Sequence, residues 1–343
     1  MKLIIQIPCL NERDTLAETI ADLPRRIDGI DEIEVLVIDD GSTDGTTEKA
    51  IELGVHHIVR FPENRGLAAA FMAGMDAGLR LGADIIVNTD ADNQYKGADI
   101  PLLVAPIVKG EADFVIGDRQ TDKIEHFSPL KKLLQKWGSG LVRKLSASAV
   151  ADSPSGFRAV SRKALLQIFV HNRFTYTIET VIQAGRRGLT IKNVKTSTNP
   201  QTRESRLFKS IPDYLRRAGG VMLRSYAMYR PVAIFSRLAS LLLLIGVALW
   251  GRFFFYYVTE GGYRGLVQSM IVGSTALLLS FIVFMVAVLA ELLATNRRLT
   301  EEVLLRVRRL DADLHRSRRE AGEGVKQIEG VLSTGAASWR NEP

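Results

Sequence analysis

Two long apolar stretches lie in the last third of the chain. Met270 to Ala290 contains no charged side chain, and Val232 to Gly251 contains only Arg237. A helix of about 20 residues rises about 30 Å, which matches the hydrocarbon core of a membrane. We therefore predict a transmembrane hairpin of two helices over residues 232–293. Two buried helices of a soluble core are the alternative.

The basic residues around these stretches predict how the hairpin crosses the membrane. Arginines precede the first stretch (Arg224, Arg230, Arg237) and follow the second (Arg297, Arg298, Arg306, Arg308, Arg309), whereas the connecting segment has only Arg264, with Arg252 at its edge. Because positive residues stay on the cytoplasmic side, both ends of the hairpin should be cytoplasmic. The first apolar run breaks at Pro8, which does not fit a signal peptide. We expect a multi-pass protein of the inner (plasma) membrane with a cytoplasmic N-terminal part.

The first 120 residues alternate between strand-like and helix-like segments. Short apolar runs (3–8, 34–38, 57–61, 84–88, 113–116) are separated by segments with helical spacing (12–23, 43–53, 66–81). Such alternation is typical of a mostly parallel sheet with helices on both faces. The pattern predicts an α/β fold, in which ligands bind beyond the carboxyl ends of the strands.

Composition excludes several classes of protein. The chain has 343 residues, of which 46% are hydrophobic, so it is not a disordered protein. Its single cysteine, Cys9, excludes a disulfide framework and a cysteine-rich zinc site. The formal net charge is +7, and the basic stretches 131–144 and 203–230 are interleaved with apolar residues. Such stretches suit contact with anionic lipid headgroups, with a solvated charged face as the alternative.

Acidic and amide side chains follow three of the predicted strands, in the pairs Asn11 and Glu12, Asp39 and Asp40, and Asp90 and Asp92. Acidic groups gathered at one edge repel each other unless a cation or hydrogen-bond donors lie between them. A divalent metal carrying a diphosphate would meet this need, because Mg²⁺ commonly bridges one or two carboxylates to phosphate. Asp39 or Asp40 could instead bind a ribose or a base, and residues 40–44 could be only a turn and helix N-cap.

Glycine-rich phosphate-binding motifs do not occur, since neither GxGxxG after the first strand nor GxxxxGK[ST] is present. Gly66 instead stands where it could begin a helix near a nucleotide. The preceding Arg65 could neutralise phosphate there, or it could be an ordinary surface arginine.

Several motifs recur together along residues 1 to about 210. They are IPCLNE at 7–12, VIDDGSTD at 37–44, NRG at 64–66, DADNQ at 90–94, GDR at 117–119, DSPSGFR at 152–158 and TYTIET at 175–180. In this combination the chain resembles an inverting family-2 glycosyltransferase of the GT-A fold. The later motifs look like the dolichol-phosphate mannose synthase branch, and the two apolar stretches are similar to those of bacterial polyprenyl-phosphate glycosyltransferases.

The resemblance implies a role for each matching residue. The base and ribose pocket would be lined by Pro8, Asn11, Glu12 and Asp39, and the nucleotide-sugar would also be met by Asp40, Arg65, Gly66 and Asp90. A magnesium or manganese ion would be held by Asp90, Asp92 and Gln94, with Asp92 as the direct ligand.

The implied catalytic set is Asp92, Arg119, Asp152 and Glu179. Arg119 would face the acceptor phosphate, and Asp152 and Glu179 would orient the sugar or the loops of the site. The lipid phosphate would also meet Arg203 or Arg206. Relatives often have Gly-Glu-Ser-Lys where this chain has Arg-Glu-Ser-Arg, so the choice between these two arginines stays open.

The resemblance implies transfer of a sugar from a UDP- or GDP-linked donor to a polyprenyl phosphate, such as undecaprenyl or dolichyl phosphate, with inversion. The expected partners are the donor, the lipid and the membrane, without nucleic acid. One alternative is transfer to a sugar hydroxyl in polysaccharide or glycolipid synthesis; another is a non-catalytic membrane scaffold. Processive polysaccharide synthases carry a QxxRW motif, which Gln135-Lys136-Trp137 does not match. The donor sugar does not follow from the sequence.

These patterns predict a GT-A domain (1–205), interfacial amphipathic helices (206–231), the transmembrane hairpin (232–293), and a cytoplasmic helix with a mobile tail from about residue 320 (294–343). In the last segment apolar residues recur at helical spacing, at Leu299, Val303, Val307, Leu310 and Leu314. This spacing indicates a short coiled coil between protomers, and hence a homo-oligomer. A helix that lies on its own domain or on the membrane is the alternative.

Overall fold

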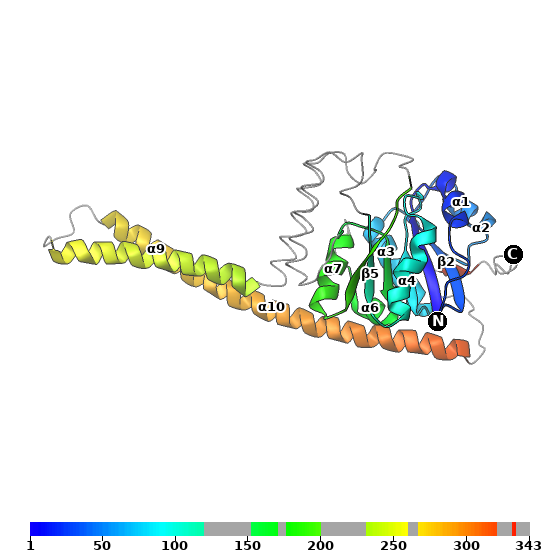
Figure 1. The fold of residues 1–343 in the computed structure, drawn as a ribbon. Helices are drawn as coiled ribbons and strands as arrows, with labels where there is room; N and C mark the ends of the chain where they lie inside the picture. The colour runs from blue at the N-terminus through cyan, green and yellow to red at the C-terminus, as the bar shows by residue number, and fades with distance from the viewer. Residues whose placement is uncertain (120–151, 171–175, 200–230, 260–266, 321–330, 334–343) are drawn as a thin grey trace. The chain divides into compact units, whose positions relative to one another are not determined.

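The structure is a computed structural model that describes residues 1–119, 152–170, 176–199, 231–259, 267–320 and 331–333 (Figure 1). The chain divides into two compact units. The first contains Met1–Ala218 together with Leu305–Pro343, and the second contains Gly219–Leu304.

A single sheet forms the centre of the first unit, with its described strands in the order β7-β5-β6-β4-β1-β2-β3-β8. The strands are β1 (Lys2–Cys9), β2 (Glu32–Asp39), β3 (His57–Arg60), β4 (Ile85–Asn88), β5 (Phe114–Asp118), β6 (Arg158–Ser161), β7 (Ile191–Lys195) and β8 (Val331–Ser333). Neighbouring strands are parallel except where β6 pairs with β4 and β5, and where β8 pairs with β3. The predicted mostly parallel α/β sheet is therefore confirmed.

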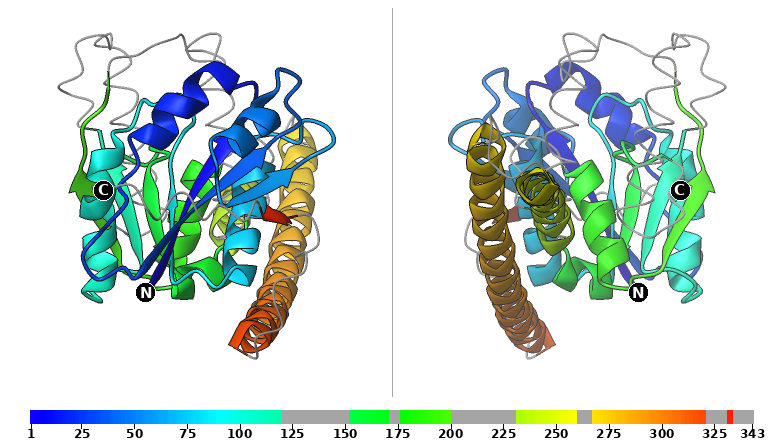
Figure 2. Two further views of the ribbon diagram at one scale, coloured as in Figure 1. Left: turned by 90° about the vertical axis from the view of Figure 1, so that its right-hand side faces the viewer. Right: turned by 90° about the vertical axis from the view of Figure 1, so that its left-hand side faces the viewer.

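Helices cover both faces of this sheet (Figure 2). They are α1 (Arg13–Ala21), α2 (Thr46–Glu52), α3 (Leu67–Arg80), α4 (Ile100–Val108), α6 (Arg162–Gln167) and α7 (Thr177–Arg186). The predicted alternation of strands and helices up to β5 is confirmed, with boundaries displaced by a few residues. The sequence pattern did not identify α4, β6, α6, α7 or β7.

One face of the sheet packs against α1 and α4. Leu3, Ile5 and Ile7 of β1 alternate with residues of the other face, as side chains do along a strand. They belong to one buried cluster with Leu16 of α1 and Leu103 of α4. This cluster fixes β1 at the centre of the sheet, so that its carboxyl end is rigidly placed.

The other face packs closely against α3, and two glycines make this approach possible. A Cβ atom on Gly74 would lie 2.4 Å from Oε1 of Gln6, and one on Gly78 would lie 2.3 Å from Cδ1 of Ile86. Both distances are far below van der Waals contact. Helix α3 therefore rests directly on β1 and β4, and its first residue follows the loop that ends at Gly66.

The second unit contains α9 (Pro231–Thr259) and the larger part of α10 (Val267–Glu320). Both helices are long and apolar enough to cross a membrane, with mean hydropathies of 2.3 and 2.7. In an apolar 18-residue window of each helix, only 11% is buried. The prediction of two long apolar helices is confirmed, and their exposure argues against the alternative of buried core helices.

Small and polar residues lie where α9 and α10 meet within this unit. Nε1 of Trp250 donates a hydrogen bond to Oγ of Ser274 at 3.2 Å. A Cβ atom on Gly246 would lie 3.1 Å from the carbonyl oxygen of Gly273. Close backbone approach at small residues, with an interhelical hydrogen bond, is typical of helix pairs in membranes.

The end of α10 belongs to the first unit, from Leu305 onward. The predicted boundary at residue 294 falls inside this continuous helix, and the end of the membrane span at that residue stays a prediction. Three residues of the tail predicted to be mobile, Val331–Ser333, instead pair with β3 as an edge strand. The predicted interfacial helices (206–231) lie outside the described residues, apart from Pro231 at the start of α9.

Candidate functional site

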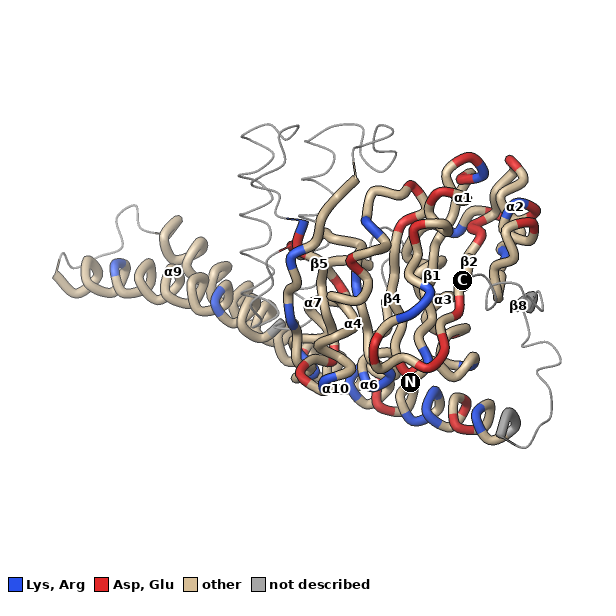
Figure 3. Tube along the Cα trace, turned by 45° about the vertical axis from the view of Figure 1, so that its right-hand side comes forward, with Lys and Arg blue, Asp and Glu red and all other residues tan. Residues whose placement is uncertain are grey.

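The strand order brings the ends of β4, β1 and β2 side by side. In the parallel register Cys9 lies opposite Asp39, and Gln6 lies opposite Asn88. The segments after these strands therefore begin at the same edge of the sheet. Acidic residues gather at the ends of β1 and β2 and on α1 and α2 (red in Figure 3). This edge is where the sequence predicted the site.

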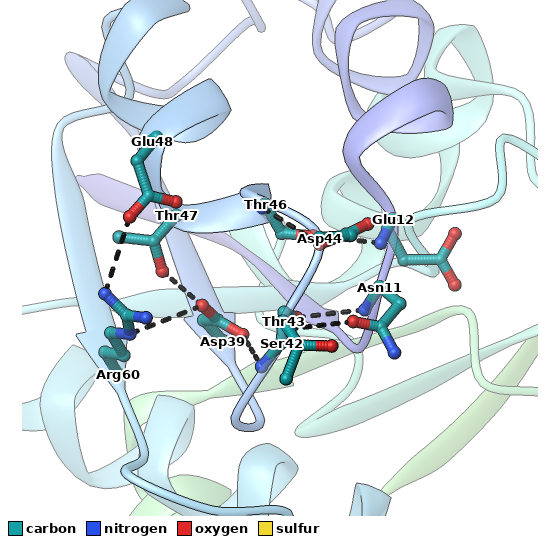
Figure 4. A network of polar contacts seen from close by, with 10 residues as sticks. All are labelled: Asn11, Glu12, Asp39, Ser42, Thr43, Asp44, Thr46, Thr47, Glu48 and Arg60. Atoms are coloured by element: carbon teal, nitrogen blue, oxygen red, sulfur yellow. Dashed lines mark hydrogen bonds and ion pairs between the residues drawn. The ribbon is translucent and has the colours of Figure 1, made fainter.

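The loops after β1 and β2 are bound to each other by hydrogen bonds (Figure 4). The N–H of Asn11 donates to Oγ of Ser42, and Oδ1 of Asn11 accepts from the N–H of Thr43, both at 2.9 Å. The N–H of Glu12 donates to Oγ1 of Thr46 at 3.0 Å. Asn11 has a φ of 54°, a left-handed conformation that asparagine tolerates. The two loops therefore form one wall of the site.

Asp39 is fully buried and holds the turn that follows β2. Its carboxylate accepts from the N–H of Ser42 at 2.8 Å and from Oγ1 of Thr47, and it lies 3.9 Å from Nε of Arg60. Such contacts are expected if the segment after β2 is a turn that leads into a helix. Contact of Asp39 with a base or a ribose stays a prediction.

Asp40 fixes the loop that leads into α3. Its two carboxylate oxygens accept from the N–H groups of Arg65 and Gly66, at 2.7 and 2.9 Å. Burial raises the pKa of Asp40 although these hydrogen bonds act in the opposite direction. Gly66 has a φ of 92°, which a residue with a side chain rarely adopts. The guanidinium of Arg65 lies over the ring of Phe61, 5.1 Å from its centre. Asp40 thus lies beside Arg65 and Gly66, and contact of these residues with a nucleotide-sugar stays a prediction.

Asp90 and Asp92 follow β4 and form a destabilised pair of carboxylates. The pKa of Asp90 is raised to about 7, mainly by burial and then by the charge of Asp92. The N–H of Gln94 donates to Oδ1 of Asp92 at 3.2 Å. No group of three or more His, Cys, Asp or Glu ligands occurs among the described residues. Two carboxylates still fit Mg²⁺ or Mn²⁺, because such ions take one or two carboxylates and complete their shell with water and phosphate.

A short loop at residues 152–157 approaches this carboxylate pair. The N–H of Gly156 donates to the hydroxyl of Tyr95 at 3.0 Å, and its carbonyl accepts from Nδ2 of Asn88 at 2.9 Å. A Cβ atom on Gly156 would lie 3.0 Å from the hydroxyl of Tyr176 and 3.3 Å from Asp90. Only glycine lets the backbone pass this close to the carboxylate without displacing it.

Arg158 donates hydrogen bonds to backbone carbonyls of the same loop. This residue was not singled out from the sequence. It is completely buried, and it donates at 2.7 Å to the carbonyls of Ser153 and Ser155 and at 2.8 Å to that of Thr177. Burial lowers the pKa of its guanidinium to about 10. The signal available in the sequence was the arginine that ends the SGFR run at 155–158, within a stretch otherwise free of basic residues.

Arg119 and Asp152 form a two-pronged ion pair beside the loop. Nε of Arg119 donates to Oδ2 of Asp152 at 2.8 Å, and Nη2 donates to Oδ1 at 3.1 Å. Burial lowers the pKa of Arg119, but Tyr95 and the charges of Asp152 and Asp90 outweigh it and raise that pKa overall. The guanidinium is therefore a permanent cation within electrostatic range of Asp90, and Asp152 sets its orientation.

Two of the remaining predicted site residues, Pro8 and Glu179, lie within the described part of the chain. Pro8 lies in β1 opposite Ile38. Glu179 is buried in α7, and its Oε1 accepts from Nε2 of Gln183 at 3.2 Å, which does not link it to the carboxylate pair. Its role in orienting the sugar stays a prediction. Arg203 and Arg206 lie outside the described residues.

Comparisons with known proteins identify the family of the chain. The model of glycosyl transferase family 2 matches residues 4–169. The undecaprenyl-phosphate mannosyltransferase of Micrococcus luteus is 32% identical over 174 residues, which are 49% of this chain and 70% of that protein. The polyprenol monophosphomannose synthase of Mycolicibacterium smegmatis is 31% identical over 172 residues, which are 48% of this chain and 63% of that protein.

A solved structure confirms the fold. The glucosyl-3-phosphoglycerate synthase of Mycobacterium tuberculosis, in complex with Mn²⁺, UDP and glucosyl-3-phosphoglycerate, aligns with a TM-score of 0.50. The alignment covers 66% of this chain and 78% of that chain at 22% identity, and at this level the likeness shows the fold alone. With the sheet, the acidic edge and the relatives in agreement, the chain belongs to glycosyltransferase family 2, with a GT-A domain followed by two long apolar helices.

Proposed function

We propose that this enzyme transfers a hexose from a nucleoside-diphosphate sugar to a polyprenyl phosphate at a membrane surface. The observation that carries the proposal is the fixed cation Arg119 within electrostatic range of Asp90, in a chain that also has two long apolar helices. A guanidinium suits the phosphate of such an acceptor, and long apolar helices suit its lipid part. The relatives named for mannosyl transfer to undecaprenyl phosphate and for polyprenol monophosphomannose synthesis support the same acceptor.

The roles of the residues follow from the chemistry of this acceptor. A phosphate monoester oxygen is already anionic at neutral pH, so it attacks the anomeric carbon of the sugar without a strong general base. The bond from that carbon to the donor diphosphate breaks on the opposite face, which inverts the configuration. Arg119 orients the incoming phosphate, because a guanidinium fork matches two phosphate oxygens. Asp152 keeps the fork in place.

A divalent metal would be held by Asp90 and Asp92, with Gln94 beside them. When bound, it supplies charge that stabilises the leaving diphosphate. A cation at this position would offset the effects of burial and of the neighbouring charge of Asp92, which together raise the pKa of Asp90 to about 7. Asp40 and Gly66 shape the donor side of the site through the loop at 64–66.

Transfer to a sugar hydroxyl is the alternative, and one observation disfavours it. A hydroxyl acceptor needs a general base close to the point of attack. Among the described carboxylates, Asp152 lies next to Arg119 and is engaged through both of its oxygens in an ion pair, so it is not placed to act as that base. The test of the proposal is an assay of labelled sugar transfer into butanol-soluble lipid, using a panel of UDP- and GDP-sugars with undecaprenyl and dolichyl phosphates.

The orientation in the membrane gives a separate prediction. We propose a multi-pass protein of the inner (plasma) membrane with a cytoplasmic catalytic domain. A cysteine at Gly262 should react with an impermeant maleimide in intact cells, whereas one at Ser338 should react only after lysis. The native Cys9 can remain, because it is buried and its thiol pKa is raised well above the usual range by burial. Labelling of Ser338→Cys but not of Gly262→Cys in intact cells would reverse the proposed orientation.

A further inference from the structure

The end of α10 contacts the catalytic domain through an arginine that has several partners there. Arg308 forms an ion pair with Asp76 of α3 and donates to the carbonyl of Ile168 at 2.9 Å. It donates also to the carbonyl of Leu165 at 3.3 Å and lies over the ring of Phe169. These acceptors lie at the end of α6, where helix carbonyls lack partners within the helix. One face of α10 is therefore docked on α3 and α6.

Neighbouring residues define this docked face. Ala312 follows Arg308 by one helical turn and is only 2% exposed. Asp311 pairs with Arg80 of α3 at 3.2 Å, and Asp313 pairs with Arg162 of α6 at 3.5 Å. Figure 3 shows charged residues of both signs along this end of α10. The two ion pairs flank Ala312 and fix the rotation of the helix about its own axis.

This rotation leaves an apolar stripe on the outer side of α10. Val307, Leu310 and Leu314 are 55%, 70% and 51% exposed, and Val303 continues the same spacing one turn earlier. We call these four residues the outer stripe. Large apolar side chains that recur on one face of a helix are costly to leave in water. The described part of the catalytic domain packs on the opposite face of the helix and leaves these side chains exposed.

We propose that the outer stripe binds the same stripe of a second copy of this chain, in a parallel coiled coil. The spacing assigns Val303 and Leu310 to heptad position d, and Val307 and Leu314 to position a. Position b of the same heptad is then Arg308 and position f is Ala312. Positions b and f point away from a partner helix, and these are the residues docked on the catalytic domain. The proposal does not depend on the reaction that the enzyme catalyses.

The charges beside the stripe favour an identical partner. Arg306 occupies position g, and Asp311 occupies the position e five residues later. In a parallel pair, g of one helix lies next to that e of the other, so Arg306 of each copy meets Asp311 of its partner. Asp311 remains 43% exposed despite its contact with Arg80. A parallel arrangement is also imposed by the membrane, because identical chains insert in the same direction.

The membrane surface is the less favoured occupant of the stripe. Leu310 follows Ala290, the end of the uncharged segment, by 20 residues of unbroken helix. At about 1.5 Å per residue this is about 30 Å of helix beyond the apolar span. The stripe covers only about two heptads, which form a weak coiled coil in solution. Two chains held in one membrane meet at a high effective concentration, which compensates for the short contact.

Disulfide cross-linking of the full chain in native membranes tests the proposal. In a parallel coiled coil, residues at a and d face their own copies. Leu310→Cys and Val307→Cys should therefore give, on mild oxidation, a product of twice the chain mass. The matched control is Arg309→Cys, at the exposed position c, which should give less than about a tenth as much. The wild type should give none, because Cys9 is buried.

A charge reversal separates an identical partner from other occupants. Arg306→Glu, made in the Leu310→Cys protein, places the new glutamate of each copy next to Asp311 of the other copy. These two like-charge contacts should slow cross-linking about fivefold. Arg309→Glu changes the net charge equally and should leave the rate unchanged. A product of another mass would assign the stripe to a different protein and overturn the proposal. The proposal would also be overturned if neither Leu310→Cys nor Val307→Cys cross-linked in correctly folded protein.

Discussion

Asp92→Ala should abolish sugar transfer while the protein keeps its fold. Asp92 follows β4 at the acidic edge, outside the buried core, so its loss should not lower the melting temperature. We expect a decrease in turnover on the order of 10³-fold or more, because metal stabilisation of a leaving group contributes several kcal/mol. In metal-free buffer the variant should melt slightly higher than the wild type, since it removes the repulsion between Asp92 and Asp90.

Three controls belong to this experiment. EDTA should abolish wild-type transfer, and added Mg²⁺ or Mn²⁺ should restore it. The exposed Asp28→Ala should behave as the wild type in both respects. Mn²⁺ with UDP or GDP should raise the melting temperature of the wild type but not that of Asp92→Ala. Full activity of Asp92→Ala in the presence of chelator would show that this carboxylate does not act through a metal.

Arg119→Lys should lower transfer about 100-fold although it preserves the charge. Lysine carries its donors on one nitrogen, so it lacks the planar fork that holds both oxygens of Asp152 and that matches two oxygens of a phosphate. The loss should be found in steps that involve the lipid. Donor binding, measured by calorimetry with the nucleotide-sugar, should remain within about twofold of the wild type.

Asp152→Asn gives a matched comparison for this prediction. It leaves Arg119 in the protein but removes the anionic partner that orients it. Transfer should again fall, by less than in Arg119→Lys, with donor binding retained. A variant of Arg119 that bound the polyprenyl phosphate normally and the donor poorly would move this residue to the donor side and refute its assigned role.

The sequence predicted the acidic edge well because its signals are local. Apolar runs that end in Asp39 or before Asp90 mark buried strands and the loops that follow them. Parallel strand order then requires these loops to meet. The contact of Asp40 with Arg65 and Gly66 did not follow from these signals, because it joins two separate loops of the chain.

The features that the sequence did not predict depend on contacts with backbone groups or between distant segments. Arg158 acts through backbone carbonyls, which carry no sequence pattern, and only burial reveals it. The spacing of the outer stripe was visible, but which face of α10 it occupies was not. That depends on Arg308 reaching Asp76, more than 200 residues earlier in the chain. The contacts by which Asp39 holds the turn after β2 likewise appear only in three dimensions.

The chemical fate of the labelled sugar tests the proposed acceptor most directly. Membranes that contain the purified full-length enzyme are given polyprenyl phosphate, Mg²⁺ and each labelled nucleotide-sugar in turn. With the correct donor, the label should enter a butanol-soluble product that mild acid releases as free sugar, because a glycosyl phosphate is acid-labile. Dephosphorylated polyprenol should give no product. Label that enters only acid-stable glycans, or that requires no lipid phosphate, would contradict the assignment of the acceptor.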